Sequence, residues 1–330
     1  MEMSQKGQND FSQEVVRRRH EYQEIRQASN LFPPATNPIL DITNSPPGEK
    51  PSMTIWYEDG TETGTSVRLY DIPGTLSGDI LRLRKNLPSV TGHFEVEGNT
   101  VRQLDHCLEP PEPNEDDFED VSDLITELPL INVDAEKHFV KKGKYRSEIE
   151  NLLRCQGGSC PGNPLSPRIV KLLGRSHDGQ LVFQRLLDCR CVLAGVSSLN
   201  IYKRWILDII EALSCLHSLG IVHRDLRLDN CLFSENGERL TLCDLESRWG
   251  QRAAPEIAND GLDAGWTTKS DIFDIGNCIK CMVYANFPIT KYVEWVVPSP
   301  LDTIVEACMR PVPSDRPSLE ELKIMVESIE

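Results

Sequence analysis

The chain contains 330 residues, of which 39% are hydrophobic, so it is long and apolar enough for one large domain with an appendage, or for two domains. Its formal net charge of −16 argues against a nucleic-acid binder, because such proteins contact phosphates with lysine and arginine. Residues 1–30 have no apolar signal-peptide core, and no apolar run approaches the thickness of a bilayer. We therefore expect a cytoplasmic or nuclear protein with reduced thiols and no membrane partner.

The first third of the chain is expected to hold three regions of different character. Residues 1–50 are polar and rich in proline, which predicts a mostly disordered N-terminal extension with one short helix over Gln13–Gln27. Residues 52–105 predict a small β-rich unit, because strand-like runs alternate with turn residues. Residues 106–120 are acidic and predict a solvated linker. The elements expected in the β-rich unit are strands over Met53–Tyr57, Ser66–Tyr70 and His93–Val96 and a short helix over Leu76–Leu87.

From about Val121 to the C-terminus, the pattern changes to strands mixed with helices. Residues 145–155 have the apolar spacing of a helix, and residues 199–219 have the pattern of a long amphipathic helix that ends at Gly220. Short apolar runs predict the strands between these helices and before them. The predicted strands are 123–131, 137–142, 169–173, 181–186 and 239–243.

Residues His223 to Asn230 place a carboxylate and an amide at a spacing that suits phosphoryl transfer. Asp225 could accept the proton of an attacking hydroxyl, and Asn230 could bind a metal ion five residues later. Asp244 directly follows a predicted strand and could bridge that metal to the phosphates of ATP. A charged surface turn is the simpler interpretation of this segment, but the strand that delivers Asp244 argues against it.

Together these residues resemble two motifs of eukaryotic protein kinases, the catalytic loop and the metal-binding Asp-Phe-Gly segment. Three later segments match the same family, at Ala254–Glu256, Ser270–Gly276 and Asp315–Ser318. The resemblance implies an ion pair between Glu256 and Arg316. It also implies that Asp271 accepts hydrogen bonds from the backbone of the catalytic loop.

The resemblance covers about residues 121–330 and implies an α+β, bilobal protein-kinase-like fold. In that fold a small strand-rich N-lobe packs on a helical C-lobe, with ATP and Mg²⁺ bound between them. By the same resemblance Asp225 is the catalytic base, and Asn230 and Asp244 bind the metal. Arg227 occupies the position of a basic residue that can contact the transferring phosphate.

A lysine on the strand before the first helix of this fold should position the ATP phosphates, and Lys141 and Lys142 are both candidates. Neighbouring residues of a strand face opposite sides, so only one of them can do so, and Lys141 is preferred. Its carboxylate partner is expected to be Glu148, with Glu150 as the weaker choice. On the adenine side, the resemblance implies Phe183 at the back of the pocket and a hinge from Gln184 to Leu186.

Three features depart from the kinase pattern. No glycine occurs between Asp123 and Lys142, so the glycine-rich loop that covers the phosphates in kinases is missing. Glu246 stands where the third residue of Asp-Phe-Gly is glycine. The segment from Asp244 to Glu256 is also short and contains Ser247 as its only hydroxyl, which argues against regulation by phosphorylation there.

The preferred hypothesis is an ATP-dependent protein kinase that phosphorylates a protein hydroxyl, with Ser or Thr favoured over Tyr. Its partners would be ATP and an unidentified protein substrate. One alternative is a pseudokinase that serves as a scaffold or binding module, which the missing glycine loop and Glu246 favour. The other is a small-molecule phosphotransferase of the aminoglycoside or choline type, which Glu246 and the short segment favour.

Overall fold

The computed structural model describes residues 10–21, 39–44, 50, 52–57, 65–70, 92–97, 100–106, 108, 117–158, 160–248, 250, 253–257, 264–284 and 296–329. The chain divides into two compact units. The larger unit contains residues 1–15, 116–285 and 297–330, and the smaller unit contains residues 16–115 and 286–296. Strand-rich sheets and separate helices make the architecture α+β, as predicted. Among the described residues, no helix has both the length and the apolarity needed to cross a membrane.

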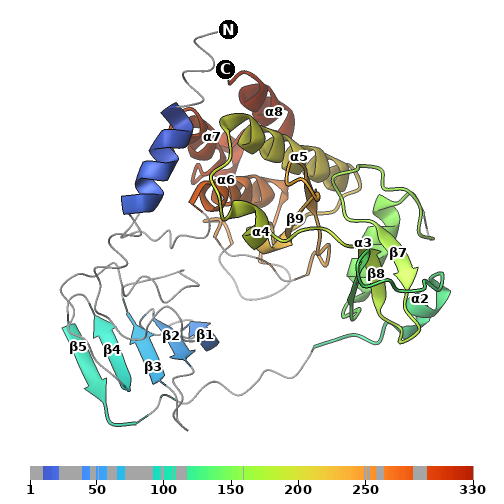
Figure 1. Ribbon diagram of the computed structural model, residues 1–330, viewed down its shortest axis with the longest axis horizontal. Coiled ribbons are helices and arrows are strands. Elements are labelled where there is room, and N and C mark those ends of the chain that lie inside the picture. Colours follow the sequence, from blue (N-terminus) through green and yellow to red (C-terminus); the bar gives the residue numbers. More distant parts are fainter. Residues whose placement is uncertain are drawn as a thin grey trace. The chain divides into compact units, whose positions relative to one another are not determined.

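The smaller unit contains a five-stranded sheet in the order β1-β2-β3-β4-β5 (Figure 1). β3 and β4 run parallel, whereas the other neighbouring strands are antiparallel. Its strands bury Ile55, Val67 and Phe94 completely, so the sheet covers a small apolar core. The strands are β1 (Ile39–Asn44), β2 (Met53–Tyr57), β3 (Thr65–Leu69), β4 (His93–Glu97) and β5 (Thr100–Leu104).

The three strands predicted for this unit are confirmed as β2, β3 and β4, each within about a residue at its ends. Within residues 1–50, where a mostly disordered extension with one short helix was predicted, the structure describes a helix over residues 10–21 and the strand β1. β1 pairs with β2, so the sheet also begins before the predicted boundary at residue 52. Pairing with β2, the next strand along the chain, supplies hydrogen bonds that the composition of residues 39–44 does not reveal. The helix predicted over Leu76–Leu87 lies outside the described residues.

After residue 116 the larger unit contains a short helix, α2 (Ser122–Glu127), where a strand over 123–131 was predicted. That prediction is wrong for residues 122–127, whereas residues 129–131 are extended. Leu130 forms a parallel bridge with Arg175, and the Ile131 N–H donates a hydrogen bond to the Arg175 carbonyl at 2.8 Å. The helix has a local cause. The Asp120 carboxylate accepts a hydrogen bond from the Ser122 N–H at 3.0 Å, and Asp123 places a second negative charge in the first turn. Both features stabilise a helix N-terminus, and they outweigh the apolar residues that suggested a strand.

A three-stranded antiparallel sheet in the order β6-β8-β7 follows α2. β6 (His138–Lys141) and β8 (Leu181–Gln184) confirm two predicted strands, whereas β7 (Leu172–Arg175) starts later than expected. Helix α3 (Arg146–Cys155) connects β6 to β7 and buries Ile149, Leu152 and Leu153. The spacing of these apolar residues matches one helical face, so α3 carries one side toward the core and one toward solvent.

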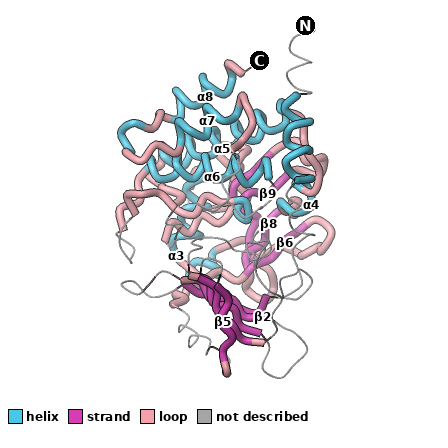
Figure 2. Tube along the Cα trace, turned by 90° about the vertical axis from the view of Figure 1, so that its left-hand side faces the viewer, coloured by secondary structure: helices cyan, strands magenta, loops and turns pink. Residues whose placement is uncertain are grey.

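The rest of the larger unit is mainly helical, and Figure 2 shows its helices gathered in one region. The predicted long helix is confirmed as α5 (Leu199–Ser218), which packs against α6 (Thr268–Tyr284) and α8 (Leu319–Glu327). Trp205 of α5 is fully buried and meets the rings of Tyr202 and Phe233 edge to face. The remaining elements are α4 (Cys189–Leu193), η2 (Leu228–Asn230), β9 (Cys231–Phe233), β10 (Leu240–Leu242), α7 (Leu301–Cys308) and η3 (Pro313–Asp315).

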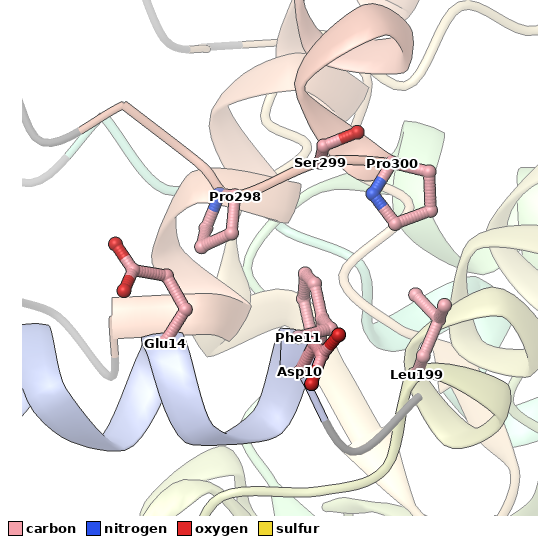
Figure 3. Close-up of a pocket in the computed structure, with 7 residues that line it drawn as sticks. All are labelled: Asp10, Phe11, Glu14, Leu199, Pro298, Ser299 and Pro300. Atoms are coloured by element: carbon pink, nitrogen blue, oxygen red, sulfur yellow. The ribbon is translucent and has the colours of Figure 1, made fainter. Parts of the chain in front are cut away.

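The helix over residues 10–21 confirms the described part of the helix predicted over Gln13–Gln27. Its first turns belong to the larger unit and bury Phe11 and Val15. The Phe11 ring meets the Tyr202 ring of α5 edge to face, with centroids 5.8 Å apart. Beside this contact lies a pocket of about 410 Å³ (Figure 3), lined by Asp10, Phe11, Glu14, Leu199, Pro298, Ser299 and Pro300.

Candidate active site

The loop after α5 brings Asp225 and Asn230 together. Gly220 adopts a φ of 71°, a left-handed conformation that favours glycine and ends α5. After η2, the Asn230 side-chain amide donates hydrogen bonds to the Asp225 carbonyl at 2.8 Å and to Asp225 Oδ2 at 2.9 Å. These two bonds hold the Asp225 carboxylate in place. They also leave the amide oxygen as the atom of Asn230 that could bind a cation.

Asp271 of α6 fixes the backbone of the same loop. Its side chain is completely buried and accepts hydrogen bonds from the backbone N–H groups of His223 and Arg224, both at 2.9 Å. The His217 ring nitrogen Nε2 lies 2.8 Å from the same carboxylate. Arg224 has a φ of 71°, which is unfavourable for a residue with a side chain, and these bonds stabilise it. The hydrogen bonds predicted for Asp271 are confirmed.

Lys141 joins the small sheet to this loop region. Its Nζ lies 2.7 Å from Glu148 Oε1 on α3 and 2.7 Å from Asp244 Oδ1, which follows β10. Lys142, the neighbouring residue, instead lies over the Phe118 ring at 5.1 Å from its centroid. The structure therefore brings Lys141, Glu148 and Asp244 together and leaves Lys142 outside this group.

The charges of this group are strongly coupled. Burial works to lower the pKa of Lys141, but the carboxylates of Glu148 and Asp244 outweigh it and raise that pKa. Burial raises the pKa of Glu148, and the attraction of Lys141 opposes the shift. Lys141 is therefore a fixed cation between two carboxylates, a suitable position for binding a phosphate oxygen.

Glu246, the residue that replaces the glycine of the kinase motif, points into the same site. Carboxylate oxygens of Glu148, Asp244 and Glu246 lie within 4.8 Å of one another. Burial, followed by repulsion from Asp244 and Glu148, raises the pKa of Glu246 to about 7. Glu148 Oε2 is buried and has no hydrogen-bond partner among the described residues. This group of one buried and two partly exposed carboxylates suits a hard cation such as Mg²⁺.

A pocket of about 220 Å³ opens beside these residues. Asp225 and Asp244 both line it, and Arg227 places its Nε 3.5 Å from Asp225 Oδ2. A hydroxyl group and a phosphate could therefore meet between a carboxylate base and an arginine. The full lining is His223, Asp225, Arg227, Asp244, Glu246, Ser247 and Gly250.

The residues expected on the adenine side lie on and after β8. Phe183 is buried and pairs in register with Phe139 of β6. Gln184 is exposed at the end of β8, and Leu186 follows at intermediate exposure. The chain then reaches the helical part, where the Leu187 and Phe233 backbones exchange two hydrogen bonds of 2.8 Å. This segment connects the two parts, the position expected for a hinge.

Two residues of α3 were missed by the sequence patterns. Ser147 Oγ donates a hydrogen bond to the Glu246 carbonyl at 2.7 Å, and Asn151 Nδ2 donates one to the Leu245 carbonyl at 2.9 Å. Both fasten α3 to the segment that carries Asp244. Their sequence signal is only a polar residue on a helix, so nothing in the local pattern identifies their partners.

The ion pair between Glu256 and Arg316 is confirmed. The two guanidinium nitrogens of Arg316 lie 2.6 and 2.7 Å from the two Glu256 carboxylate oxygens, a bidentate arrangement. The Arg316 side chain is fully buried, and its guanidinium also lies 4.9 Å from the Phe273 ring centroid. Burial opposes ionisation of Glu256, but its hydrogen bonds with Arg316 lower its pKa.

Comparison with known proteins gives partial matches to Ser/Thr kinases, and no family model matches the chain. It is 28% identical over 189 residues to the serine/threonine-protein kinase/endoribonuclease IRE1 of Oryza sativa subsp. japonica, covering 44% of this chain and 20% of that protein. It is 31% identical over 121 residues to the serine/threonine-protein kinase chk-2 of Caenorhabditis elegans, covering 32% of this chain and 25% of that protein. It is 34% identical over 124 residues to the serine/threonine-protein kinase UCN of Arabidopsis thaliana, covering 34% of this chain and 30% of that protein. The chain thus spans less than a third of each of these relatives.

Proposed function

From the premise that this chain is a divergent protein kinase-like protein, we propose that it is an ATP-dependent protein kinase. It transfers the γ-phosphate of ATP to a protein hydroxyl, with Ser or Thr as the favoured acceptor. The observation that carries the proposal is Lys141, which lies 2.7 Å from both Glu148 and Asp244. A lysine fixed between these two carboxylates, beside Asp225 in one site, is the arrangement that phosphoryl transfer requires.

The residues of the site fit ATP with Mg²⁺. Asp244 and the Asn230 amide oxygen would hold the cation, and Glu246 adds a further carboxylate within reach of Asp244. Lys141 would bind phosphate oxygens, while Phe183 and the segment from Gln184 to Leu186 would face the base. When bound, Mg²⁺ neutralises charge on the phosphate oxygens that ATP presents.

The chemical step would then depend on Asp225 and Arg227. Asp225 accepts the proton of the incoming hydroxyl at its carboxylate, which Asn230 holds in a fixed orientation. Arg227, with Nε 3.5 Å from that carboxylate, is placed to contact the transferring phosphate. The small pocket beside Asp225 has room for a hydroxyl group next to that carboxylate.

The test is phosphate transfer from radiolabelled ATP to peptide pools that contain Ser, Thr or Tyr as the only acceptor. The full chain should transfer phosphate only with Mg²⁺, and Asp225→Asn should lower the rate by about 10²–10⁴-fold. Asp178→Asn is the control, because Asp178 is an exposed carboxylate in the turn between β7 and β8 and does not line the pocket, and it should retain activity.

Binding of the nucleotide, measured in parallel by calorimetry, separates the alternatives. Asp225→Asn should still bind ATP with Mg²⁺, because its defect lies in the chemical step. Transfer that persists in Asp225→Asn would contradict the kinase assignment. Binding without any transfer would point to a pseudokinase, and transfer only to small amino alcohols or aminoglycosides would point to a small-molecule phosphotransferase.

A further inference from the structure

Glu119 connects the start of α3 to the segment after Asp244, and the proposed reaction needs these two segments in a fixed relative position. Its Oε2 accepts a hydrogen bond at 2.8 Å from the backbone N–H of Arg146, the first residue of α3. Its Oε1 accepts one at 2.5 Å from Nη1 of Arg248, four residues after Asp244. The first N–H groups of a helix lack partners within the helix and favour a negative charge. One carboxylate therefore caps α3 and binds the segment that carries Asp244.

Arg248 is held by more than Glu119. Its Nε lies 3.7 Å from Asp117 Oδ2, and its guanidinium lies over the Tyr145 ring at 4.9 Å from the centroid. Tyr145 precedes α3 directly and donates its hydroxyl to Asp117 Oδ1 at 2.5 Å. The Arg248 side chain is only 24% exposed, so these interactions are partly shielded from solvent.

Residues 117–119 lie along the start of α3. The Glu119 N–H donates a hydrogen bond to the Lys144 carbonyl at 2.9 Å, and the Phe118 ring meets the Tyr145 ring edge to face. Lys144 also places its Nζ 4.7 Å from the Phe118 ring centroid. The segment is thus attached to α3 by backbone, aromatic and charged contacts, and it holds Glu119 where Arg248 can reach it.

The contacts of Arg248 continue those that α3 makes with residues 245 and 246. Together with Ser147 and Asn151, they fix α3 against the segment that begins at Asp244. Glu148 lies between these contacts along α3 and reaches Lys141 from there. A shift of α3 would separate Glu148 from Lys141, so the position of the helix decides whether the phosphate-binding group is assembled.

The groups that could respond to a phosphate on this segment are already occupied. Ser247 Oγ donates a hydrogen bond to the Val222 carbonyl at 2.5 Å. Arg224 Nη1 donates one to the Arg248 carbonyl at 3.4 Å, and its guanidinium lies 5.5 Å from the Trp266 ring centroid. Residues 247 and 248 are therefore already held by Glu119, Arg224 and the Val222 carbonyl.

We propose that Glu119 and Arg248 form a clamp that holds α3 in its working position, so that the site is assembled without phosphorylation of the segment after Asp244. The proposal rests on the proposed kinase function and concerns regulation of the same site. Arg248 and Glu119 are positioning residues, because they act through α3 and Glu148. Among the described residues, neither of them lines the pocket that contains Asp225 and Arg227.

The test compares Arg248→Met, Arg248→Lys and Glu119→Gln in the full chain. Arg204→Met is the matched control, because Arg204 makes a single 2.9 Å ion pair with Glu238 on the helical part. The first readout is hydrogen exchange of the α3 amides, which reports opening of the helix without any need for activity. The second readout is the split between KM for ATP and kcat.

We expect Arg248→Met to speed exchange in α3 and to raise KM by about fivefold, with little change in kcat or in exchange of α5. Arg248→Lys retains the charge and should recover part of the loss, and Glu119→Gln should resemble Arg248→Met. Wild-type chain treated with a phosphatase, and shown by mass to lack phosphate, should keep its KM and kcat.

Unchanged α3 exchange in both Arg248→Met and Glu119→Gln would overturn the clamp, as would the same change in Arg204→Met. A loss of activity after phosphatase treatment would overturn the independence from phosphorylation. These outcomes are distinct from failure of the proposed function. If wild type transfers no phosphate, the exchange measurement still decides whether the clamp holds α3.

Discussion

The helical part of the larger unit and its small sheet keep the kinase pattern to different degrees. In the helical part, Asp271 accepts hydrogen bonds from the backbone of His223 and Arg224, and Arg316 binds Glu256, as the family resemblance implies. In the small sheet, only three strands are described, and α2 lies where a further strand was expected. The residues that hold the catalytic loop are buried and bonded to several partners, so their replacement destabilises the fold. Residues that cover a phosphate lie at the surface and can change at smaller cost.

The largest effect should come from breaking the buried ion pair of the helical part. Arg316→Met leaves the Glu256 carboxylate without its bidentate partner and should lower the free energy of unfolding by about 3–5 kcal/mol. Chemical denaturation followed by circular dichroism measures this change. Arg190→Met, which removes an exposed 3.4 Å pair with Asp188, should cost less than about 1 kcal/mol. Similar losses in both variants would contradict the central role of the buried pair.

Asp271→Asn should have the next largest effect. The amide keeps one acceptor oxygen but replaces the other by a donor, which faces backbone N–H groups that also donate. We expect a loss of about 2–3 kcal/mol in unfolding free energy, measured as above, together with a lower transfer rate. Asp302→Asn at the start of α7 serves as the control and should cost less than about 1 kcal/mol. A stable Asp271→Asn variant with full activity would show that the loop does not depend on this anchor.

A comparison of two neighbouring lysines sharpens the description of the small sheet. Lys141→Met should weaken binding of ATP with Mg²⁺ by about tenfold, or about 1.4 kcal/mol, because it removes the cation that faces the phosphates. Lys142→Met should leave binding unchanged, because Lys142 lies over Phe118. Calorimetric titration measures both affinities. Equal weakening in the two variants would remove the reason for preferring Lys141.

An effect that depends on pH is expected from a buried carboxylate in the helical part. Asp274 of α6 is buried, and neither carboxylate oxygen has a hydrogen-bond partner among the described residues. Burial, followed by repulsion from Asp271, Asp225 and Glu256, raises the pKa of Asp274 well above its usual value, with Arg316 opposing. The folded chain therefore binds a proton that the unfolded chain releases, so stability should fall as pH rises above the ordinary aspartate pKa.

Asp274→Asn tests this pH dependence, because the amide stays neutral at every pH. Relative to wild type, the variant should gain stability as pH rises from about 4 toward 7, and the advantage should vanish in acid. Thermal unfolding across this pH range measures the difference. A constant difference at all pH values would show that Asp274 keeps its ordinary pKa.

Much of the fold was predictable where apolar residues recur at a regular interval along the sequence. The apolar residues of α3 and α5 recur with the helical period over ten or more residues, and both helices are confirmed. The prediction of a strand over 123–131 was wrong for residues 122–127, because a short apolar run fits either structure and Asp120 and Asp123 favour the start of a helix. β1 was missed for a different reason, because its pairing with β2 cannot be inferred from the composition of residues 39–44.

The sequence by itself determined the chemistry available at the candidate site. The spacing of Asp225, Asn230 and Asp244, and the later Glu256 and Arg316, placed the chain near one family because these residue types recur there at these intervals. It also showed the departures, the absent glycines and Glu246. A motif of this kind is local, so it can be read before the chain is folded.

Only the tertiary structure decided which residues meet across long separations. Lys141 and Asp244 are 103 positions apart, and Glu119 and Arg248 are 129 apart. Lys141 and Lys142 look alike in the sequence, and only their contacts in the structure distinguish them. Lys141 forms an ion pair with Glu148 of α3, whereas Lys142 lies over the Phe118 ring. Such contacts depend on how α3 and the small sheet pack on the helical part, because side-chain chemistry gives a residue its potential partners and packing selects one of them.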